Sequence, residues 1–482
     1  MSTLSLLASV IAASSAQATE ITVYNQGFAL VKESRQLQLN KGFQRVAIED
    51  VATQIETDSV GIRSVSAPGS FSVLEQNYQY DLISPQAILL KAVGSEITLN
   101  RVNPDGSKER IVGTLLSAPG QVAGTAGNYV YSGMVLQTKD GRILLSPTGE
   151  IEVTSIPDGL ISRPTLMWEL ECAKAGANTV ELSYLTGGVS WSASYVLALD
   201  QSGSMGDVKG WVTMNNGSGM TFKDAKLKLL AGEVERNRPR DFGAPRGSGG
   251  VEAAPMTKAD FAEEQFADYH LYTLGRPATV RNNEQKQLSL LEGTGIKVQK
   301  RLVIDPMRNY QGWRANEGEV GTGSMKPQVR IEFKNSKENK MGMPMPKGQV
   351  KVFQRDSSGS LQMLGEDAID HTPKDELLSL VVGRAFDIVV ERKRTKFEYI
   401  YSDAGSKRSN IGARESYEIE IRNRKDTDET VDLIERFWGD WKVTKNSDDF
   451  TRPNAETLLF IVPVKANSTK KVTFTVENRW GR

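Results

Sequence analysis

The amino-acid sequence predicts a mainly β protein with multidomain antiparallel β-sandwiches and a small barrel segment. Short runs of alternating apolar and polar residues recur along most of the chain, as expected for strands with one buried face. The 43 glycines provide many positions for tight turns. The length of 482 residues indicates several hydrophobic cores, because a single core rarely extends beyond about 250 to 300 residues.

Residues 1–18 have the pattern of a secretory signal peptide. Leu4–Ala13 is an apolar run too short to cross a bilayer, and residues 16–18 (Ala-Gln-Ala) match the small-residue pattern of a cleavage site. The segment departs from the usual pattern because it has no Lys or Arg before the apolar run. We expect a mature chain that begins at Thr19, carries no transmembrane segment after removal of the signal, and is periplasmic or secreted.

The charge balance and the cysteine count exclude several classes of protein. Lys plus Arg and Asp plus Glu both number 59, and no dense basic block appears, so nucleic acid is not an expected partner. Cys172 is the single cysteine, so the chain cannot form an internal disulfide. Its apolar neighbours predict a buried side chain rather than a nucleophile. The sequence indicates no cofactor apart from a divalent cation in one hypothesis below.

The N-terminal half divides into a β domain at 19–83 and a barrel segment at 84–157. A short helix is expected between them, with Ser84 as its cap, Pro85 at its first position and Gly94 at its end. Five short strands follow the helix and resemble a small SH3-like or Sm-like barrel. Their expected ranges are Glu96–Arg101, Ile111–Leu116, Tyr129–Gln137, Ile143–Ser146 and Glu150–Thr154.

The rest of the chain reads as a central β region, a loop and a C-terminal module. The central region covers 158–236 and continues at 263–405, interrupted at 237–262 by a Pro- and Gly-rich segment that we expect to be a flexible loop. Residues 406–482 contain alternating strands spaced as in an immunoglobulin-like sandwich. Trp168, Trp191 and Trp211 lie on expected strands, where aromatic residues more often pack in a core than form a carbohydrate platform.

The loop at 365–376 is dense in carboxylates and contains one of the two histidines. The candidate binding residues here are Asp367, Asp370, His371, Asp375 and Glu376. His371 is also the candidate catalytic base, because the neighbouring carboxylates could raise its basicity or share a cation with it. The structural alternative is a turn in which Asp370 accepts backbone N–H groups and Pro373 fixes the bend.

A second candidate metal site lies at Asp200, Ser202 and Ser204. This Asp-x-Ser-x-Ser spacing can present hard oxygen ligands to Mg²⁺ at the end of a strand. The chain leads directly into another strand at Trp211, however, which favours a hairpin turn rich in Asp, Ser and Gly. The other histidine, His270, lies in an alternating strand and is interpreted as a core or edge residue.

Five separated segments resemble the mucoidy-inhibitor-like domain-of-unknown-function family numbered 4139. They are Val23–Val31, Leu160–Leu166, Leu182–Trp191, Tyr269–Leu274 and Asp370–Glu376. The resemblance implies an exported or envelope-associated β-rich protein and supplies no established catalytic residue. The chain differs from the mucoidy-inhibitor members in lacking their long helical hairpin and in carrying the barrel-like segment.

Two hypotheses for function follow. The first is a non-enzymatic, exported protein that acts through contacts with an envelope protein or a glycan, because the sequence contains no complete catalytic constellation. The second is a divalent-metal-dependent hydrolase built on the loop 365–376, with His371 as base and Asp367, Asp370 and Asp375 as oxygen ligands.

Overall fold

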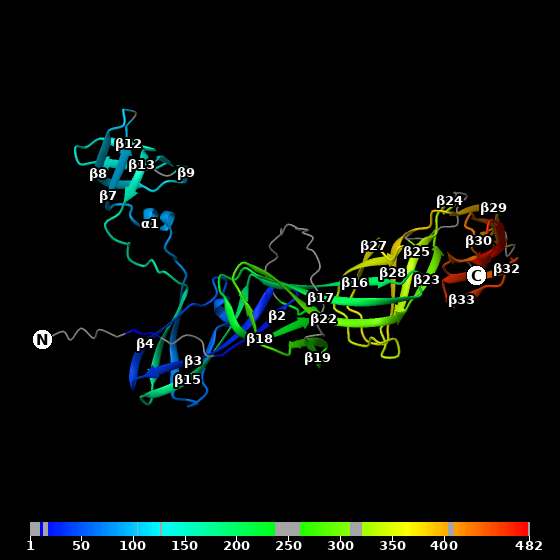
Figure 1. Ribbon diagram of the computed structural model, residues 1–482, viewed down its shortest axis with the longest axis horizontal. Helices are drawn as coiled ribbons and strands as arrows, with labels where there is room; N and C mark the ends of the chain where they lie inside the picture. Colours follow the sequence, from blue (N-terminus) through cyan, green and yellow to red (C-terminus); the bar gives the residue numbers. More distant parts are fainter. Residues whose placement is uncertain are drawn as a thin grey trace. The chain divides into compact units, whose positions relative to one another are not determined.

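The computed structural model describes residues 10–12, 18–103, 105–125, 128–236, 261–308, 321–402 and 409–480. These residues form 35 strands, one 3-10 helix (Thr57–Ser59) and one α-helix, α1 (Pro85–Lys91), which confirms a mainly β protein (Figure 1). Neither helix has the length and apolar content needed to cross a membrane. Most of the expected signal peptide (1–18) and of the expected flexible loop (237–262) lies outside the described residues.

The chain divides into two compact units. Unit 1 contains residues 1–190, 215–229 and 276–286, and unit 2 contains residues 191–214, 230–275 and 287–482. Both units are built from segments that are distant in sequence. Strand pairing therefore does not follow chain order.

Unit 1 contains two sheets from the first part of the chain. One has the order β1 (Val10–Ala12), β4 (Gly42–Glu49), β14 (Thr165–Cys172) and β6 (Phe71–Gln79). The other contains, in order, β18 (Phe222–Ala231), β2 (Ala18–Tyr24), β3 (Phe28–Leu39), β15 (Gly176–Gly187) and β5 (Gly61–Ser64), with β21 (Ala278–Val280) paired to β18. Strand β3 alternates buried and more exposed residues, as the sequence predicts.

Cys172 and two of the three tryptophans are buried, as predicted. Cys172 is 1% exposed, and its Sγ atom accepts a hydrogen bond from Gln44 Nε2 at 2.7 Å. Burial raises the pKa of the Cys172 thiol, which opposes formation of the thiolate nucleophile. Trp168 and Trp191 are 1% and 4% exposed, whereas Trp211 is half-buried.

The segment after α1 forms a seven-stranded sheet with its own core. In order, its strands are β12 (Ile143–Leu145), β11 (Val135–Thr138), β8 (Lys108–Ser117), β7 (Glu96–Val102), β13 (Thr148–Glu152), β10 (Asn128–Ser132) and β9 (Gln121–Thr125). Leu89 and Ala92 pack with apolar residues of these strands. The helix prediction is confirmed, since Ser84 Oγ accepts the N–H of Ala87 at 3.1 Å and Pro85 occupies the first position.

The predicted closure of this segment into a barrel is wrong for the described residues. The sheet ends at β12 and β9, and no pairing joins these two edges within the part of the segment that the structure describes. The expected single strand Tyr129–Gln137 is instead divided into β10 and β11. The division occurs at Gly133, whose φ of 81° belongs to a turn rather than a strand.

Unit 2 contains a hairpin and a five-stranded sheet. The hairpin is β19 (Phe261–Phe266) with β20 (Tyr269–Leu274). The sheet order is β22 (Glu284–Lys297), β17 (Met205–Asn216), β16 (Val189–Leu199), β26 (Gly348–Arg355) and β27 (Leu361–Ile369). Strands β16 and β26 run parallel, although more than a hundred residues separate them in the sequence.

Two further sheets of unit 2 share one hydrophobic core. The first has the order β28 (Leu377–Arg384), β25 (Gln328–Lys334), β23 (Gln299–Ile304), β31 (Glu429–Arg436), β34 (Thr457–Val464) and β33 (Thr451–Asn454). The second has the order β24 (Gly323–Met325), β29 (Ile388–Ser402), β30 (Ser409–Asn423), β35 (Thr469–Arg479) and β32 (Asp440–Asn446). Strands on both sides of residue 406 contribute to these sheets, and the shared core is consistent with a β-sandwich.

A buried ion pair connects these two sheets. Arg392 on β29 donates two hydrogen bonds of 2.8 Å to the carboxylate of Glu435 on β31, and the two side chains are 2% and 1% exposed. The guanidinium also lies 4.2 Å from the ring centroid of Tyr417. Burial alone would lower the pKa of Arg392, but the adjacent Glu435 carboxylate raises it. The Arg392 guanidinium therefore remains charged inside the core.

The substitution Arg392→Met is expected to destabilise this part of unit 2 by about 3 to 5 kcal/mol, because it leaves the Glu435 carboxylate buried without a partner. Urea unfolding followed by tryptophan fluorescence measures the effect, since Trp441 is one of the buried residues of this core. The matched control is Lys465→Met, which removes an exposed pair with Asp428 and should cost less than about 1 kcal/mol. Equal losses for the two variants would contradict a structural role for the buried pair.

Candidate functional site

The acidic corner, defined here as residues 365–376, comprises the end of β27 and its connection to β28. Asp367 lies on β27, and its Oδ2 atom accepts the backbone N–H of Val381 on β28 at 2.7 Å. The other oxygen accepts the N–H of Ala368 at 2.9 Å. A Cβ atom at Gly365 would collide with the carbonyl oxygen of Val382, so only glycine permits this close approach of the strands.

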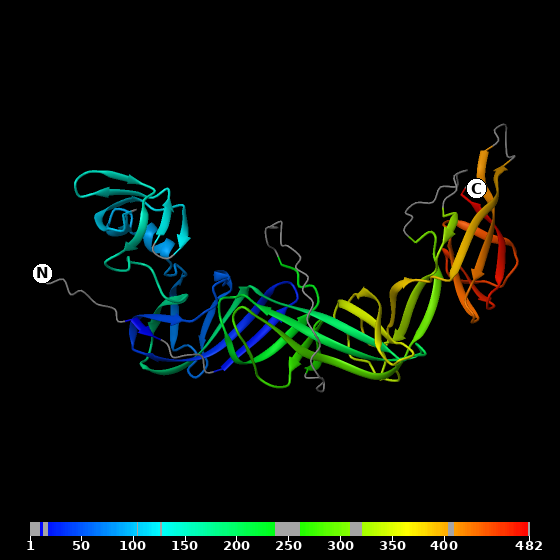
Figure 2. The same cartoon turned by 45° about the horizontal axis from the view of Figure 1, so that its top comes forward.

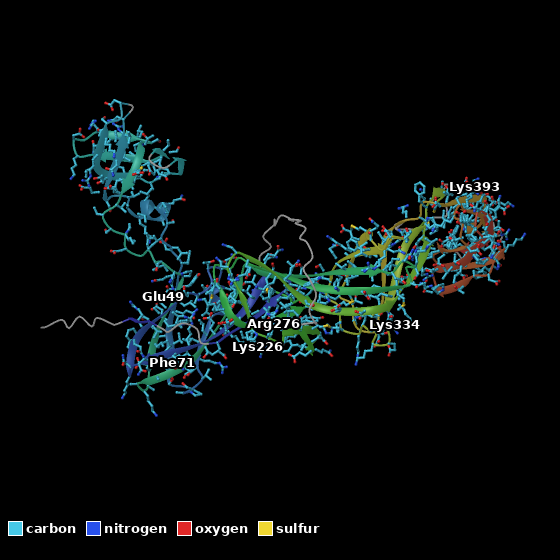
Figure 3. The ribbon with its side chains drawn as sticks, viewed as in Figure 1. Glu49, Phe71, Lys226, Arg276, Lys334 and Lys393 are labelled. Carbon is cyan, nitrogen blue, oxygen red and sulfur yellow. The ribbon has the colours of Figure 1, made fainter. Side chains whose placement is uncertain are left out.

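Asn335 holds the far end of the acidic corner. This residue follows Lys334 (labelled in Figure 3) at the end of β25, and its side chain is fully buried. Its Nδ2 atom donates to the carbonyl oxygens of Met343 and Pro373 at 2.9 and 3.0 Å. Its backbone carbonyl accepts the N–H of Asp375 at 2.7 Å, and its N–H donates to the carbonyl of Glu376 at 2.9 Å. One asparagine thus fixes the backbone that carries two of the candidate carboxylates.

The middle of the acidic corner is held by Thr372. Its hydroxyl donates to the carbonyl oxygen of Asp370 at 2.8 Å, and its backbone exchanges two hydrogen bonds of 2.8 Å with Met345. Asp375 adopts a left-handed backbone conformation with φ of 66°. The side chains of Asp370, Asp375 and Glu376 are exposed. The corner is therefore fixed through its backbone, while these three carboxylates face solvent.

His371 interacts with the neighbouring chain through its ring nitrogen. The backbone N–H of Lys347 donates to His371 Nδ1 at 3.3 Å, which requires this nitrogen to be unprotonated. His371 is exposed at the surface, but partial desolvation of its ring and the positive charge of Lys347 lower its pKa, although Asp370 and Glu233 act in the opposite direction. His270 also lies near enough to influence this pKa electrostatically. The two histidines, about a hundred positions apart in sequence, therefore lie in one region of unit 2.

The structure places His270 on the β19–β20 hairpin. Its Nδ1 atom lies 2.7 Å from Glu263 Oε1, and the histidine side chain is partly exposed. His270 is thus a half-buried strand residue whose ring has the carboxylate of Glu263 as its partner. Among the described residues, no three His, Cys, Asp or Glu side chains are grouped so that they could hold a metal ion.

Asp200, Ser202 and Ser204 form a compact turn between β16 and β17. Ser202 Oγ donates to Asp200 Oδ2 at 2.7 Å, and the backbone N–H of Ser204 donates to Asp200 Oδ1 at 3.1 Å. The two serine hydroxyl oxygens lie 2.6 Å apart. The hydrogen bond from Ser202 is the main cause of the lowered pKa of Asp200. The three side chains thus come together, and they satisfy one another and the backbone of the turn.

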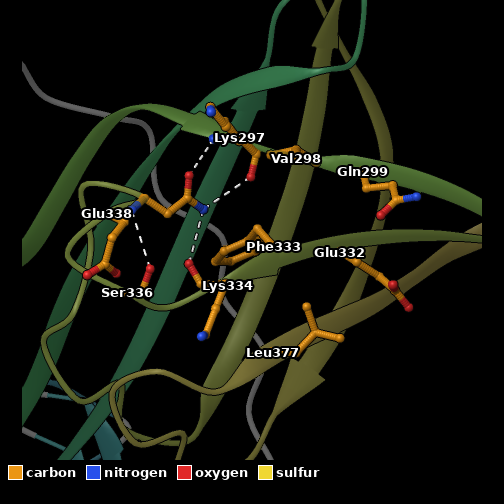
Figure 4. A pocket seen from close by; sticks show the side chains of 10 residues that line it. Lys297, Val298, Gln299, Glu332, Phe333, Lys334, Ser336, Glu338 and Leu377 are labelled. Atoms are coloured by element: carbon orange, nitrogen blue, oxygen red, sulfur yellow. Dashed lines mark hydrogen bonds between the residues drawn. The ribbon is translucent and has the colours of Figure 1, made fainter.

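A shallow pocket of about 370 Å³ lies beside the acidic corner (Figure 4). Asn339 closes one side of the pocket. Its Oδ1 atom accepts the backbone N–H of Lys297 at 2.6 Å, and its Nδ2 atom donates to the carbonyl oxygens of Lys297 and Lys334 at 3.1 and 3.0 Å. Lys297, Lys334, Glu332 and Glu338 give the pocket walls charges of both signs. This lining has no net preference for an anion or a cation.

An aromatic row on β29 was not identified from the sequence. It consists of Phe397, Tyr399 and Tyr401, and it lies on the long β29–β30 hairpin (orange in Figure 2; Lys393, near its start, is labelled in Figure 3). Successive ring centroids are 4.9 and 6.2 Å apart. The sequence signal was available, since residues at alternate positions of a strand share one face.

Comparison with known proteins leaves the family open: no protein-family model and no curated protein matches this chain. The resemblance to family 4139 therefore remains a prediction. The arguments on function below depend on the residues and their geometry.

The substitution Asn335→Ala is expected to destabilise unit 2 by about 2 to 4 kcal/mol, because it leaves several buried backbone groups without partners. Urea unfolding measures the loss, and hydrogen exchange at the amide of Asp375 should become faster. The control is Asn446→Ala, which removes one exposed hydrogen bond to Asp448. Unchanged exchange at Asp375 would show that the acidic corner does not depend on Asn335.

The stability of unit 2 should depend on the protonation of His371. A folded-state pKa below the ordinary value of 6.5 means that the unfolded chain binds the proton more readily. The stabilisation is therefore complete above about pH 6.5 and is lost as the pH falls through the folded pKa. In His371→Asn the amide oxygen can still accept the Lys347 N–H, so this variant should lose less stability than the wild type between pH 7.5 and 5.

Unfolding midpoints in urea at the two pH values test this expectation. NMR titration of the two histidine ring signals supplies an independent measurement, with the His371→Asn variant identifying the His371 signal. Titration of His371 at or above 6.5, or equal pH dependence in both proteins, would contradict the expectation.

Proposed function

We propose that this chain is an exported, non-enzymatic binding component of the cell envelope, and that it contacts a glycan through the aromatic row of β29. The signal-like residues 1–18 and the resemblance to family 4139 support an envelope location. The aromatic row is the observation that favours a glycan over an envelope protein as the ligand.

The rings of the aromatic row follow one another along one strand. Phe397 and Tyr399 are partly exposed, and Tyr401 is 41% exposed. Aromatic rings combine an apolar face with a rigid shape, and the tyrosines add a hydroxyl group that can bond to polar partners. A linear polysaccharide presents apolar C–H faces and hydroxyl groups in repeating order. A row of rings along an extended strand matches this chemistry.

A largely buried ion pair and an exposed tryptophan lie beside the row. The guanidinium of Arg394 lies 4.8 Å from the ring centroid of Phe397 and donates to Glu415 Oε2 at 3.0 Å. Trp480, which is 45% exposed, lies at the same end of the sheet, because its N–H donates to the carbonyl of Ile411 at 3.0 Å. Trp480 therefore adds exposed aromatic surface near the row, whereas the side chains of Arg394 and Glu415 are only 10% and 7% exposed and support the Phe397 ring.

The geometry of the acidic corner favours a binding role over the metal-dependent hydrolase. Asp367 and His371 would serve as ligand and base in the hydrolase, but both accept backbone N–H groups. A side chain that fixes the backbone in this way is less available to bind a cation or abstract a proton. Calorimetric titration with Ca²⁺, Mg²⁺ and Mn²⁺ tests the hydrolase directly, and a flat trace with all three is expected.

The glycan proposal predicts that Tyr399→Ala weakens binding to a soluble envelope polysaccharide about tenfold, equivalent to roughly 1.4 kcal/mol. The probes are muramidase-digested peptidoglycan and purified capsular polysaccharide, measured by calorimetry with the purified full chain. Phe386→Ala is the matched control, because Phe386 is 80% exposed but lies outside the row. Its affinity should remain within twofold of the wild type.

Absence of binding to both polysaccharides would overturn the proposal. Equal affinity of the wild type and Tyr399→Ala would also overturn it. Binding to an envelope protein alone would exclude the glycan and favour the other partner class.

A further inference from the structure

The seven-stranded sheet of unit 1 has a cavity of about 760 Å³ between α1 and its strands. The first turns of α1 form one wall through Pro85, Ile88 and Leu89, and β10 and β13 form the opposite wall. Leu89 is also part of the core of this segment. The cavity is therefore an opening into the apolar core and lies within one compact unit.

The lining of the cavity defines the chemistry of its ligand. None of the eleven lining residues is charged, although 24% of the residues in the chain are charged. The two aromatic residues are Tyr129 and Tyr131, whose ring centroids are 6.5 Å apart. Ile151 and Val153 of the β13 region add aliphatic surface. Such a lining cannot compensate the loss of hydration that an ionised group would suffer on entry.

Two polar groups of the lining already have partners. Ser84 Oγ accepts the N–H of Ala87 at the start of α1. The hydroxyl of Tyr131 forms a hydrogen bond with the backbone of Ile151. Both hydroxyls are uncharged and take part in the local fold, so neither supplies a counter-charge for an ionised ligand. Apolar contact remains the main source of affinity.

The size of the cavity fits a small molecule. Ligand sites in proteins commonly have volumes of about 300 to 1,000 Å³ and are lined mainly by apolar and aromatic side chains. We propose that this cavity is a binding site for an uncharged apolar small molecule, or for the hydrocarbon part of a larger one. This inference is independent of the glycan proposal, which concerns unit 2.

A fluorescence titration with N-phenyl-1-naphthylamine, an uncharged apolar dye, tests the site in the full chain. The wild type should bind the dye saturably with one site. Val153→Trp places a larger side chain in the cavity and should raise the dissociation constant at least tenfold. The control Val102→Trp adds the same side chain on the outer part of the same sheet, where Val102 is 58% exposed, and should change the constant less than twofold.

Competition experiments define the ligand class. Displacement of the dye by dodecan-1-ol indicates a hydrocarbon chain, and displacement by naphthalene indicates an aromatic ring; either result supports the proposal. Circular dichroism establishes that Val153→Trp is folded. A rise in the wild-type melting temperature at saturating dodecan-1-ol or naphthalene provides a measurement that needs no variant.

Three results would overturn the proposal. They are the absence of saturable dye binding, equal affinity of Val153→Trp and the wild type, and failure of both competitors to displace the dye. The last result would leave an apolar side chain of a protein partner as the alternative occupant.

Discussion

The chain depends on one recurring constraint: carbonyl and N–H groups that leave a strand inside the protein must find partners. Asn216, Asn335 and Asn423 meet this requirement at the ends of three strands, and each is at most 2% exposed. Each donates its amide N–H groups to backbone carbonyls of a crossing segment and accepts a backbone N–H through its side-chain oxygen. An asparagine amide has both donors and an acceptor, whereas an aspartate carboxylate can only accept. The three residues therefore stabilise the corners around which the sheets are built.

This constraint determines what the acidic corner can do. Its backbone is bound by Asn335, and Asp367 and His371 accept N–H groups from neighbouring segments. The remaining carboxylates are exposed, where water solvates them well. The carboxylates that cluster in this part of the sequence therefore fall into two groups. Some accept hydrogen bonds from the backbone, and the others face solvent. Charge density alone does not distinguish these roles.

The local part of the fold was predictable from sequence, and the pairing between distant strands was not. Ser84 and Pro85 define the start of α1 through short-range capping, so the helix was predicted correctly. Alternation of apolar residues identified strands but does not specify their neighbours. The parallel pairing of β16 with β26 joins segments far apart in sequence. Asn335 was missed for the same reason, because its partners, including Pro373, lie on other segments.

The free energy of ligand binding depends on which polar and apolar groups a ligand can contact at the surface of the protein. Buried polar groups that already have partners must lose a hydrogen bond before they can bind a ligand, and this exchange contributes little net free energy. Exposed apolar and aromatic surface has no such cost and contributes about 25 cal/mol for each Å² removed from water. The cavity beside α1 and the aromatic row of β29 provide this kind of surface. For this reason we propose that ligands bind at these two features and that the acidic corner has a structural role.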